Sequence, residues 1–353
     1  MFGFEHKHFT MQEAFLVLQP VSYRYLFTDF ELRNLSYQLD SGGFSSELLM
    51  FGDTTTLFAR ARLGRRLLQK GATPSGLITF GLLADPDISI HWRNFDIDGD
   101  KLLIFPPSGE LHSISRPDFD VFTLSLSLSE ETLNRTCHSL ELPDFRKLVD
   151  GNEAFNCHPE SMSLLRKWLH NTALGLANSP PAADENIRLQ HLEQELARRL
   201  ISTLTESMGP VYQPVMRKRD RALKIAVDFI LESDTPVTSV QDLCSIAHVS
   251  ERTLEYAFRE RFGQSPKAFT LTHRLNNVRK MLKLANPDAN SIYEISGRQG
   301  FFHMGQFTSD YKRLFNELPS ETLRKYITRL RNESGQSLPI SNSGLKHLAN
   351  SFS

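Results

Sequence analysis

Two stretches near the C-terminus share one spacing of apolar residues, although few of their residues are identical. They are VSERTLEYAFRERFGQSP (residues 249–266) and FHMGQFTSDYKRLFNELP (residues 302–319). Four positions recur 53 residues apart: Leu254, Phe258, Phe262 and Pro266 in the first stretch, and Phe307, Tyr311, Phe315 and Pro319 in the second. The positions between them differ. The pattern predicts one helical scaffold built twice, with two different outer surfaces.

A short apolar helix is predicted before each stretch. Three apolar or small positions recur 49 residues apart: Leu243, Ile246 and Ala247, then Ile292, Ile295 and Ser296. Thr238 with Gln241, and Ser291 with Glu294, have the spacing of a capping box. Two short helices joined by a tight turn make a helix-turn-helix, so the chain is predicted to hold two of them.

The second helix of each predicted pair ends at an equivalent residue. Gly263 in the first copy corresponds to Asn316 in the second, again 53 residues on. Both residue types tolerate the left-handed backbone that ends many helices. A long helix over residues 267–284 is predicted to join the two pairs and to span ~27 Å.

The region 221–331 resembles the AraC family of bacterial transcription regulators. The resemblance rests on VSERTLEYAFRERFGQSPKAFTLTHRLNNVRKML and SIYEISGRQGFFHMGQFTSDYKRLFNELPSETLR, about a third of the chain. Ser296, Val278 and Asn316 depart from the usual family residues without removing a core position. Within the family, GFFHMGQFTSDYKRLF is most similar to regulators like the ethanolamine-operon activator. The resemblance implies an effector-responsive transcriptional activator whose partners are double-stranded DNA and RNA polymerase.

The resemblance also indicates which residues contact bases. In the first copy, Arg252 can pair with guanine, Glu255 can accept from cytosine, and Tyr256 can meet a thymine methyl group or a phosphate. The base candidates of the second copy are Met304, Gly305, Thr308 and Ser309. This second face has little hydrogen-bonding reach, so we expect the first unit to carry more base discrimination.

Five basic residues are candidates for contacts to the DNA backbone, which position a protein without reading sequence. They are Arg259, Lys267, Arg274, Lys312 and Arg313. If the two reading helices lie about one DNA turn apart, ~34 Å, both can enter successive major grooves on one side of the duplex.

The remainder of the chain divides by pattern. Residues 30–128 hold short apolar runs separated by turn clusters, which predicts a strand-rich region, and residues 129–207 show helical spacing. We predict a sensor domain over 1–207, a linker over 208–218, a DNA-binding domain over 219–331 and a disordered tail over 332–353. The predicted fold class is α+β, with an N-terminal cupin-like β-barrel and flanking helices, and an all-α C-terminal domain.

The cupin-like prediction rests on PPSGELHS, in which Pro107, Gly109 and His112 resemble a second cupin motif. The alternative is that Pro107 and Gly109 shape a turn and that His112 is a strand residue. Of the other metal ligands that a cupin needs, only His91 is in the right neighbourhood, so we expect no metal and no cofactor. A pocket for a small-molecule effector is predicted from the family logic, lined by Phe80, His91, Trp92, Phe105 and His112.

Charge separates the two halves. Residues 217–331 hold 20 Lys and Arg against 13 Asp and Glu, whereas residues 1–216 hold 19 against 27. A basic half beside an acidic half is consistent with nucleic acid as a partner of the basic half. Three scattered cysteines, no secretion signal and no run of 18 apolar residues indicate a cytoplasmic protein without a membrane segment.

Other interpretations stay open. A leucine stripe at residues 189, 192, 196, 200 and 204 can form a homodimer helix through 186–206, or it can pack within the chain. The absence of GxSxG, HExxH, P-loop and GxGxxG motifs argues against an enzyme. The alternatives are a cupin-like enzyme or metal-binding domain fused to a DNA-binding module, and an architectural DNA-binding protein without an effector.

Overall fold

A computed structural model describes most of the chain, in eleven segments. These are residues 23–27, 36–43, 46–52, 55–63, 65–92, 95–115, 121–178, 185–211, 216–233, 239–285 and 291–324. The chain packs as two compact units: unit 1 contains residues 1–233 and 237–272, and unit 2 contains residues 234–236 and 273–353. The tail predicted to be disordered, 332–353, lies outside the described residues. The domain boundaries set out above stay a prediction.

Eight strands of unit 1 form one antiparallel sheet in the order β1-β3-β4-β11-β6-β9-β12-β13. Their bounds are β1 Tyr23–Phe27, β3 Ser46–Gly52, β4 Thr56–Leu63, β6 Leu77–Leu83, β9 Lys101–Phe105, β11 Val121–Ser129, β12 Ala154–Asn156 and β13 Gly209–Pro210. The last strand falls inside the predicted linker 208–218. Part of that segment is therefore hydrogen-bonded to the sheet rather than free.

Five further strands form a second antiparallel sheet in the order β2-β5-β10-β7-β8. They are β2 Ser36–Gln38, β5 Leu67–Ala72, β7 Ile90–Trp92, β8 Phe95–Ile97 and β10 Glu110–Ser115. The strand-rich region predicted over 30–128 is confirmed. In the part of the chain that the structure describes, these strands make two sheets and no closed ring. The N-terminal sheet domain is therefore confirmed, whereas the closed cupin-like barrel stays a prediction.

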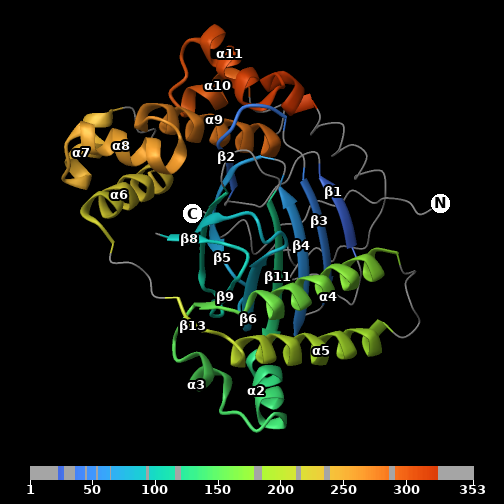
Figure 1. The fold of residues 1–353 in the computed structure, drawn as a ribbon. Helices are drawn as coiled ribbons and strands as arrows, with labels where there is room; N and C mark the ends of the chain where they lie inside the picture. The colour runs from blue at the N-terminus through green and yellow to red at the C-terminus, as the bar shows by residue number, and fades with distance from the viewer. Residues whose placement is uncertain are drawn as a thin grey trace. The chain divides into compact units, whose positions relative to one another are not determined.

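Four helices share a core with one face of the larger sheet. They are α2 Glu130–Ser139, α3 Phe145–Val149, α4 Pro159–Asn178 and α5 Glu185–Thr205. Figure 1 shows α4 and α5 lying across the sheet. Because side chains alternate along a strand, Ile78, Phe80 and Leu82 of β6 all face these helices. Helical spacing over 129–207 is thereby confirmed, with the short strand β12 as an addition.

The opposite face of the larger sheet packs against the smaller sheet. Leu83, Leu103 and Phe105 of the larger sheet share one core with Trp92 and Ile97 of the smaller sheet. The ring centroids of Trp92 and Phe105 lie 5.7 Å apart in an edge-on arrangement. Burial of this seam on both sides holds the two sheets face to face.

Unit 1 also contains the first predicted helix-turn-helix. Its helices are α6 Lys218–Glu232, α7 Val240–Ala247 and α8 Glu251–Phe262, followed by the start of α9 Pro266–Leu284. Three residues of the smaller-sheet region, Leu39, Leu68 and Ile114, lie in the same core as these helices. The side-chain amide of Gln264 donates to the carbonyl oxygen of Leu39 at 2.6 Å.

Unit 2 contains the remainder of α9, then α10 Ile292–Arg298 and α11 Met304–Phe315. A row of aromatic rings runs through its core, with centroid distances of 5.1 Å for Phe301–Phe307, 5.7 Å for Phe307–Tyr311 and 4.7 Å for Tyr311–Phe315. The joining helix predicted over 267–284 is confirmed. Among the described helices, none combines the length and the hydropathy needed to cross a bilayer.

Candidate nucleic-acid interface

The first helix-turn-helix is held by caps and an aromatic core. Ser239 caps α7 by accepting from the backbone N–H groups of Gln241 and Asp242. The cap predicted at Thr238 is therefore one residue too early, and Thr238 itself lies outside the described residues. Ser250 caps α8 by accepting from the Thr253 N–H, as each helix start needs a partner for its free N–H groups.

The second helix-turn-helix repeats this construction with different residues. Ser291 and Glu294 form the predicted capping box at the start of α10. The four repeated positions of the first copy, Leu254, Phe258, Phe262 and Pro266, are buried, and so are Phe307, Tyr311, Phe315 and Pro319 of the second. Ala247 and Ser296, the small residues where the two helices of each pair meet, are buried as well. The shared scaffold is confirmed.

Helix α8 presents its base candidates on one exposed stripe. Arg252, Glu255, Tyr256 and Arg259 follow the three- and four-residue spacing of one helix face. The Arg252 guanidinium carbon lies 5.5 Å from the centre of the Tyr256 ring. Nε of Arg259 donates to Oε1 of Glu255 at 2.6 Å. The stripe is thus ordered by two side-chain pairs, Arg252 with Tyr256 and Glu255 with Arg259, and it has an arginine at each end.

The outer face of α11 is less polar. Gly305 and Ser309 are exposed, and Met304 and Thr308 are half-buried. The Ser296 hydroxyl donates to the sulfur of Met304 at 3.4 Å, so the thioether is tied to α10. A Cβ added at Gly305 would meet no atom within 4 Å. Glycine is therefore not required by packing at this position, and it leaves the helix surface flat there.

The phosphate candidates differ in how exposed they are and in which residues they contact. Lys267 and Lys312 are exposed. Arg313 is also exposed, and its Nη2 lies 2.7 Å from the carboxylate of the buried Asp310. Arg274 is half-buried: its Nε donates to the carbonyl oxygen of Gln299 at 2.7 Å, and its guanidinium stacks 4.4 Å from the Phe301 ring.

Burial lowers the pKa of Arg274. Its contacts bind α9 to the turn before α11, so Arg274 has a structural role inside unit 2. The DNA-contact candidates thus lie on the helices α8, α9 and α11, and the contacts themselves stay predictions.

The predicted effector-pocket residues do not converge on one place. Phe80 faces helices α2–α5 and lies 5.7 Å, edge-on, from Phe145. Trp92 and Phe105 face the seam between the sheets. Nδ1 of His91 lies 3.0 Å from Oδ1 of Asp96, and His112 lies on β10, opposite Lys70 of β5. Among the predicted pocket side chains that the structure describes, Trp92 and Phe105 contact each other. The alternation of the strands separates Phe80 from both.

The segment PPSGELHS forms a tight turn. Gly109 N–H donates to the Pro106 carbonyl oxygen at 2.8 Å, and a Cβ at Gly109 would lie 2.7 Å from that oxygen. The alternative given for Pro107 and Gly109, a turn followed by a strand, is therefore confirmed. Within the described residues, no group of three or more His, Cys, Asp or Glu side chains is placed to hold a metal.

The leucine stripe of α5 packs within the chain. Leu189, Leu192, Leu196, Leu200 and Leu204 are all buried in the core that α5 shares with the larger sheet. This is the second of the two alternatives given for the stripe, because leucines in that core are not free to form a dimer surface.

Sequence patterns did not identify Phe302 or His303 as surface residues beside α11. Both are exposed, and the His303 side chain makes no capping hydrogen bond to α11. The doubled phenylalanine in GFFHM is the available signal, because the repeat requires only one apolar residue in that turn.

Comparison with known proteins decides what the two scaffolds are. Residues 243–325 match the helix-turn-helix domain family, from inside α7 to just past α11. The C-terminal region is therefore similar to the helix-turn-helix domain family. The match runs through both of the helix-turn-helix scaffolds described above.

Two relatives are similar to part of this chain. A XylDLEGF operon transcriptional activator of Pseudomonas putida is 30% identical over 144 residues, 40% of this chain and 45% of that protein. A probable thc operon regulatory protein of Rhodococcus erythropolis is 34% identical over 103 residues, 29% of this chain and 31% of that protein. The chain thus spans less than half the length of these relatives.

Solved structures are similar only at low scores. The AraC-like transcriptional activator CuxR is 13% identical, with a TM-score of 0.34 over 78% of this chain and 91% of CuxR. A probable AraC family regulator from Rhodopseudomonas palustris CGA009 is 28% identical, with a TM-score of 0.28 over 30% of this chain and 96% of that structure. Scores this low add nothing to the assignment.

Proposed function

We propose that the protein is a sequence-specific DNA-binding transcription regulator. The observation that carries the proposal is the pair of helix-turn-helix scaffolds with matched cores and unlike outer faces. Repeated cores with different exteriors suit a chain that reads two different DNA segments, because the base-facing side chains set the sequence that each unit prefers. The relatives named as operon activators support activation as the direction of regulation.

The remaining parts of the chain fit an effector-responsive activator. The two-sheet region with its helices is proposed as a cupin-like sensor over 1–207, joined through 208–218 to a DNA-binding domain over 219–331. A small molecule would act by binding two arrangements of the chain unequally. RNA polymerase is the proposed protein partner and the cytoplasm the proposed location. A homodimer would use a surface other than the buried leucines of α5.

The test is a binding-site selection with the full chain. Random duplex DNA is offered, bound molecules are recovered, and affinity for the recovered sequence is compared with that for scrambled duplexes over a range of salt. A regulator should prefer the selected sequence by at least about 1,000-fold. Recovery of no common sequence, with binding that depends only on salt, would instead indicate an architectural DNA-binding protein.

A further inference from the structure

Two adjacent phenylalanines before α11 have opposite environments. Phe301 is 9% exposed, whereas Phe302 is 71% exposed. The ring of Phe301 contacts Phe307 and carries the Arg274 guanidinium. The apolar core of the turn is therefore complete without Phe302.

The internal repeat shows that the exposure of Phe302 belongs to the second helix-turn-helix and has no counterpart in the first. With the 53-residue offset, Phe302 corresponds to Val249 and His303 to Ser250. Val249 is partly buried against the core of the first unit, and Ser250 caps α8. In the second unit, the packed residue is replaced by an exposed ring and the capping residue by an exposed imidazole.

The surface beside Phe302 is shaped for close approach. Gly305, the second residue of α11 and three residues after Phe302, has open space where a Cβ would be. Met304 is tied back to Ser296, and Phe302 is the exposed large apolar side chain next to the start of α11. An exposed phenylalanine ring next to a glycine can approach an apolar group on a binding partner closely, because no side chain at Gly305 stands in the way.

We propose that Phe302 is a specificity-determining residue of the second unit and that it packs against the C5-methyl group of thymine in the major groove. The inference rests on the proposed function. The thymine methyl is the apolar group that a base pair presents in the major groove, and a phenylalanine ring offers no hydrogen-bond donor or acceptor to any other base-edge group. The second unit would then read sequence by shape and apolar contact, where the first unit uses charged side chains.

The experiment replaces thymine with deoxyuridine, which removes the methyl group and leaves the hydrogen-bonding edges unchanged. The probe is the duplex selected by the full chain, with thymines substituted one at a time. Loss of one buried methyl contact should weaken wild-type binding about 3- to 5-fold at one or two positions, all in the same half of the site. The Phe302→Ala chain should bind the thymine and deoxyuridine duplexes equally well at those positions.

Two control variants make the result specific. Leu164→Ala removes a side chain of similar exposure, 61%, from α4, and it should keep the full thymine preference. Phe302→Leu retains an apolar side chain and should keep part of it. Folding of each variant is checked by circular dichroism, and Phe302 is exposed enough that its loss should leave the fold intact.

The outcomes separate the inference from the proposed function. If the chain selects a sequence but Phe302→Ala discriminates thymine from deoxyuridine as the wild type does, the inference is wrong and the proposed function stands. Phe302→Ala could also weaken binding to the thymine and deoxyuridine duplexes by the same factor, which is the result expected for a side chain inserted between base steps. That result also overturns the inference. If no sequence is selected at all, the proposed function itself fails.

Discussion

Arg252 and Tyr256 illustrate how much a single exposed pair can contribute. The guanidinium lies 5.5 Å from the ring centre, which restricts the rotamers of a long side chain before DNA arrives. An arginine that is already ordered loses less conformational entropy when it makes two hydrogen bonds to a guanine. We therefore expect Arg252 to read a base rather than to serve as one more diffuse positive charge.

The Arg252→Ala substitution tests this directly. Binding to the selected duplex should weaken by about 1–3 kcal/mol, and a repeated selection should show one relaxed base position. Arg198→Ala is a matched control, because Arg198 is an exposed arginine on α5. Equal sequence preference in the wild type and in Arg252→Ala would remove Arg252 from the reading face.

His273 is a residue whose burial predicts a pH dependence. The residue is only 6% exposed, and burial lowers its pKa from 6.5 to about 4. Between these two values the unfolded chain binds a proton that the folded chain does not. The stability contributed by neutral His273 is therefore complete above about pH 6.5 and is lost as the pH falls toward 4.

Urea unfolding at several pH values measures this effect. The free energy of unfolding should be about 2 kcal/mol lower at pH 5 than at pH 8 on account of His273, and His273→Gln should show a correspondingly smaller decrease. His170→Gln, at an exposed position of α4, should leave the decrease unchanged. Identical pH profiles for wild type and His273→Gln would show that His273 is not protected from protonation.

The helix ends repeat as faithfully as the helix cores. Gly263 after α8 has φ of 64°, and Asn316 after α11 has φ of 55°. Each backbone N–H donates to a carbonyl four residues earlier, on Arg259 and on Lys312. The equivalence predicted from sequence is confirmed, because a helix that must stop and turn at that residue needs a left-handed backbone there.

Alanine and glycine at these two caps should therefore have different effects on stability. Gly263→Ala and Asn316→Ala should each lower the free energy of unfolding by about 1 kcal/mol, since alanine is strained at positive φ. Asn316→Gly should be neutral or slightly stabilising at the same φ. Thermal unfolding of the three variants measures this, and a destabilising Asn316→Gly would mean that the asparagine side chain, not the backbone, holds the turn.

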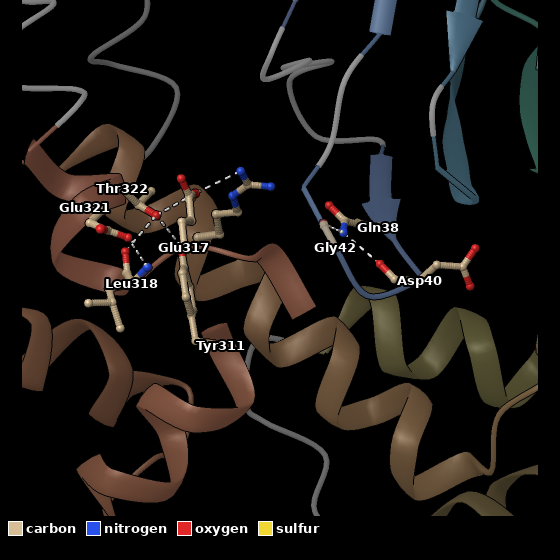
Figure 2. A network of polar contacts seen from close by, with 9 residues as sticks. Gln38, Asp40, Gly42, Tyr311, Glu317, Leu318, Glu321 and Thr322 are labelled. Atoms are coloured by element: carbon tan, nitrogen blue, oxygen red, sulfur yellow. Dashed lines mark hydrogen bonds and ion pairs between the residues drawn. The ribbon is translucent and has the colours of Figure 1, made fainter. Parts of the chain in front are cut away.

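A buried polar network closes the end of unit 2. Figure 2 shows Thr322 between Tyr311 and Glu317, with its hydroxyl 2.8 Å from the oxygen of each. Nη2 of Arg279 on α9 donates to the same Oε1 of Glu317 at 2.9 Å. Glu317 is only 8% exposed. This network ties the segment after α11 to the joining helix.

Removing the carboxylate from this network should destabilise unit 2 strongly. Glu317→Ala removes the carboxylate that the Arg279 guanidinium contacts. We expect this to lower the free energy of unfolding by about 3–5 kcal/mol. Glu260→Ala breaks an exposed pair with Arg219 and should change stability by less than about 1 kcal/mol. Hydrogen exchange of the α10 and α11 amides measures both, and equal protection in the two variants would contradict a structural role for the buried pair.

At the scale of the whole molecule, sequence predicts local repetition better than long-range pairing. The two helix-turn-helix units were predictable because their apolar spacing recurs within short windows. The sheets were not, since β11 pairs with β4 and β6, which are distant in the chain. The faces of Phe80 and Phe105 follow from that register, so a pocket could not be assigned from their residue types. Likewise, GFFHM alone does not say which phenylalanine is buried.

For the same reason, the sequence could not show whether the leucine stripe packs within the chain or against a second copy. A stripe of leucines indicates that a helix buries one face, and the sheet that it covers is formed by strands far away in sequence. Charge asymmetry, by contrast, survives folding, because it depends on composition rather than on register. The basic C-terminal region remains the natural site for a polyanion.

The central claim is that two matched scaffolds read two different segments of one duplex. Hydroxyl-radical footprinting of the full chain on its selected duplex tests it, with Arg252→Ala and Phe302→Ala as probes of the two units. We expect two protected stretches about one helical turn apart, with Arg252→Ala changing base preference in one and Phe302→Ala in the other. A single protected stretch, or two variants that alter the same bases, would contradict the claim.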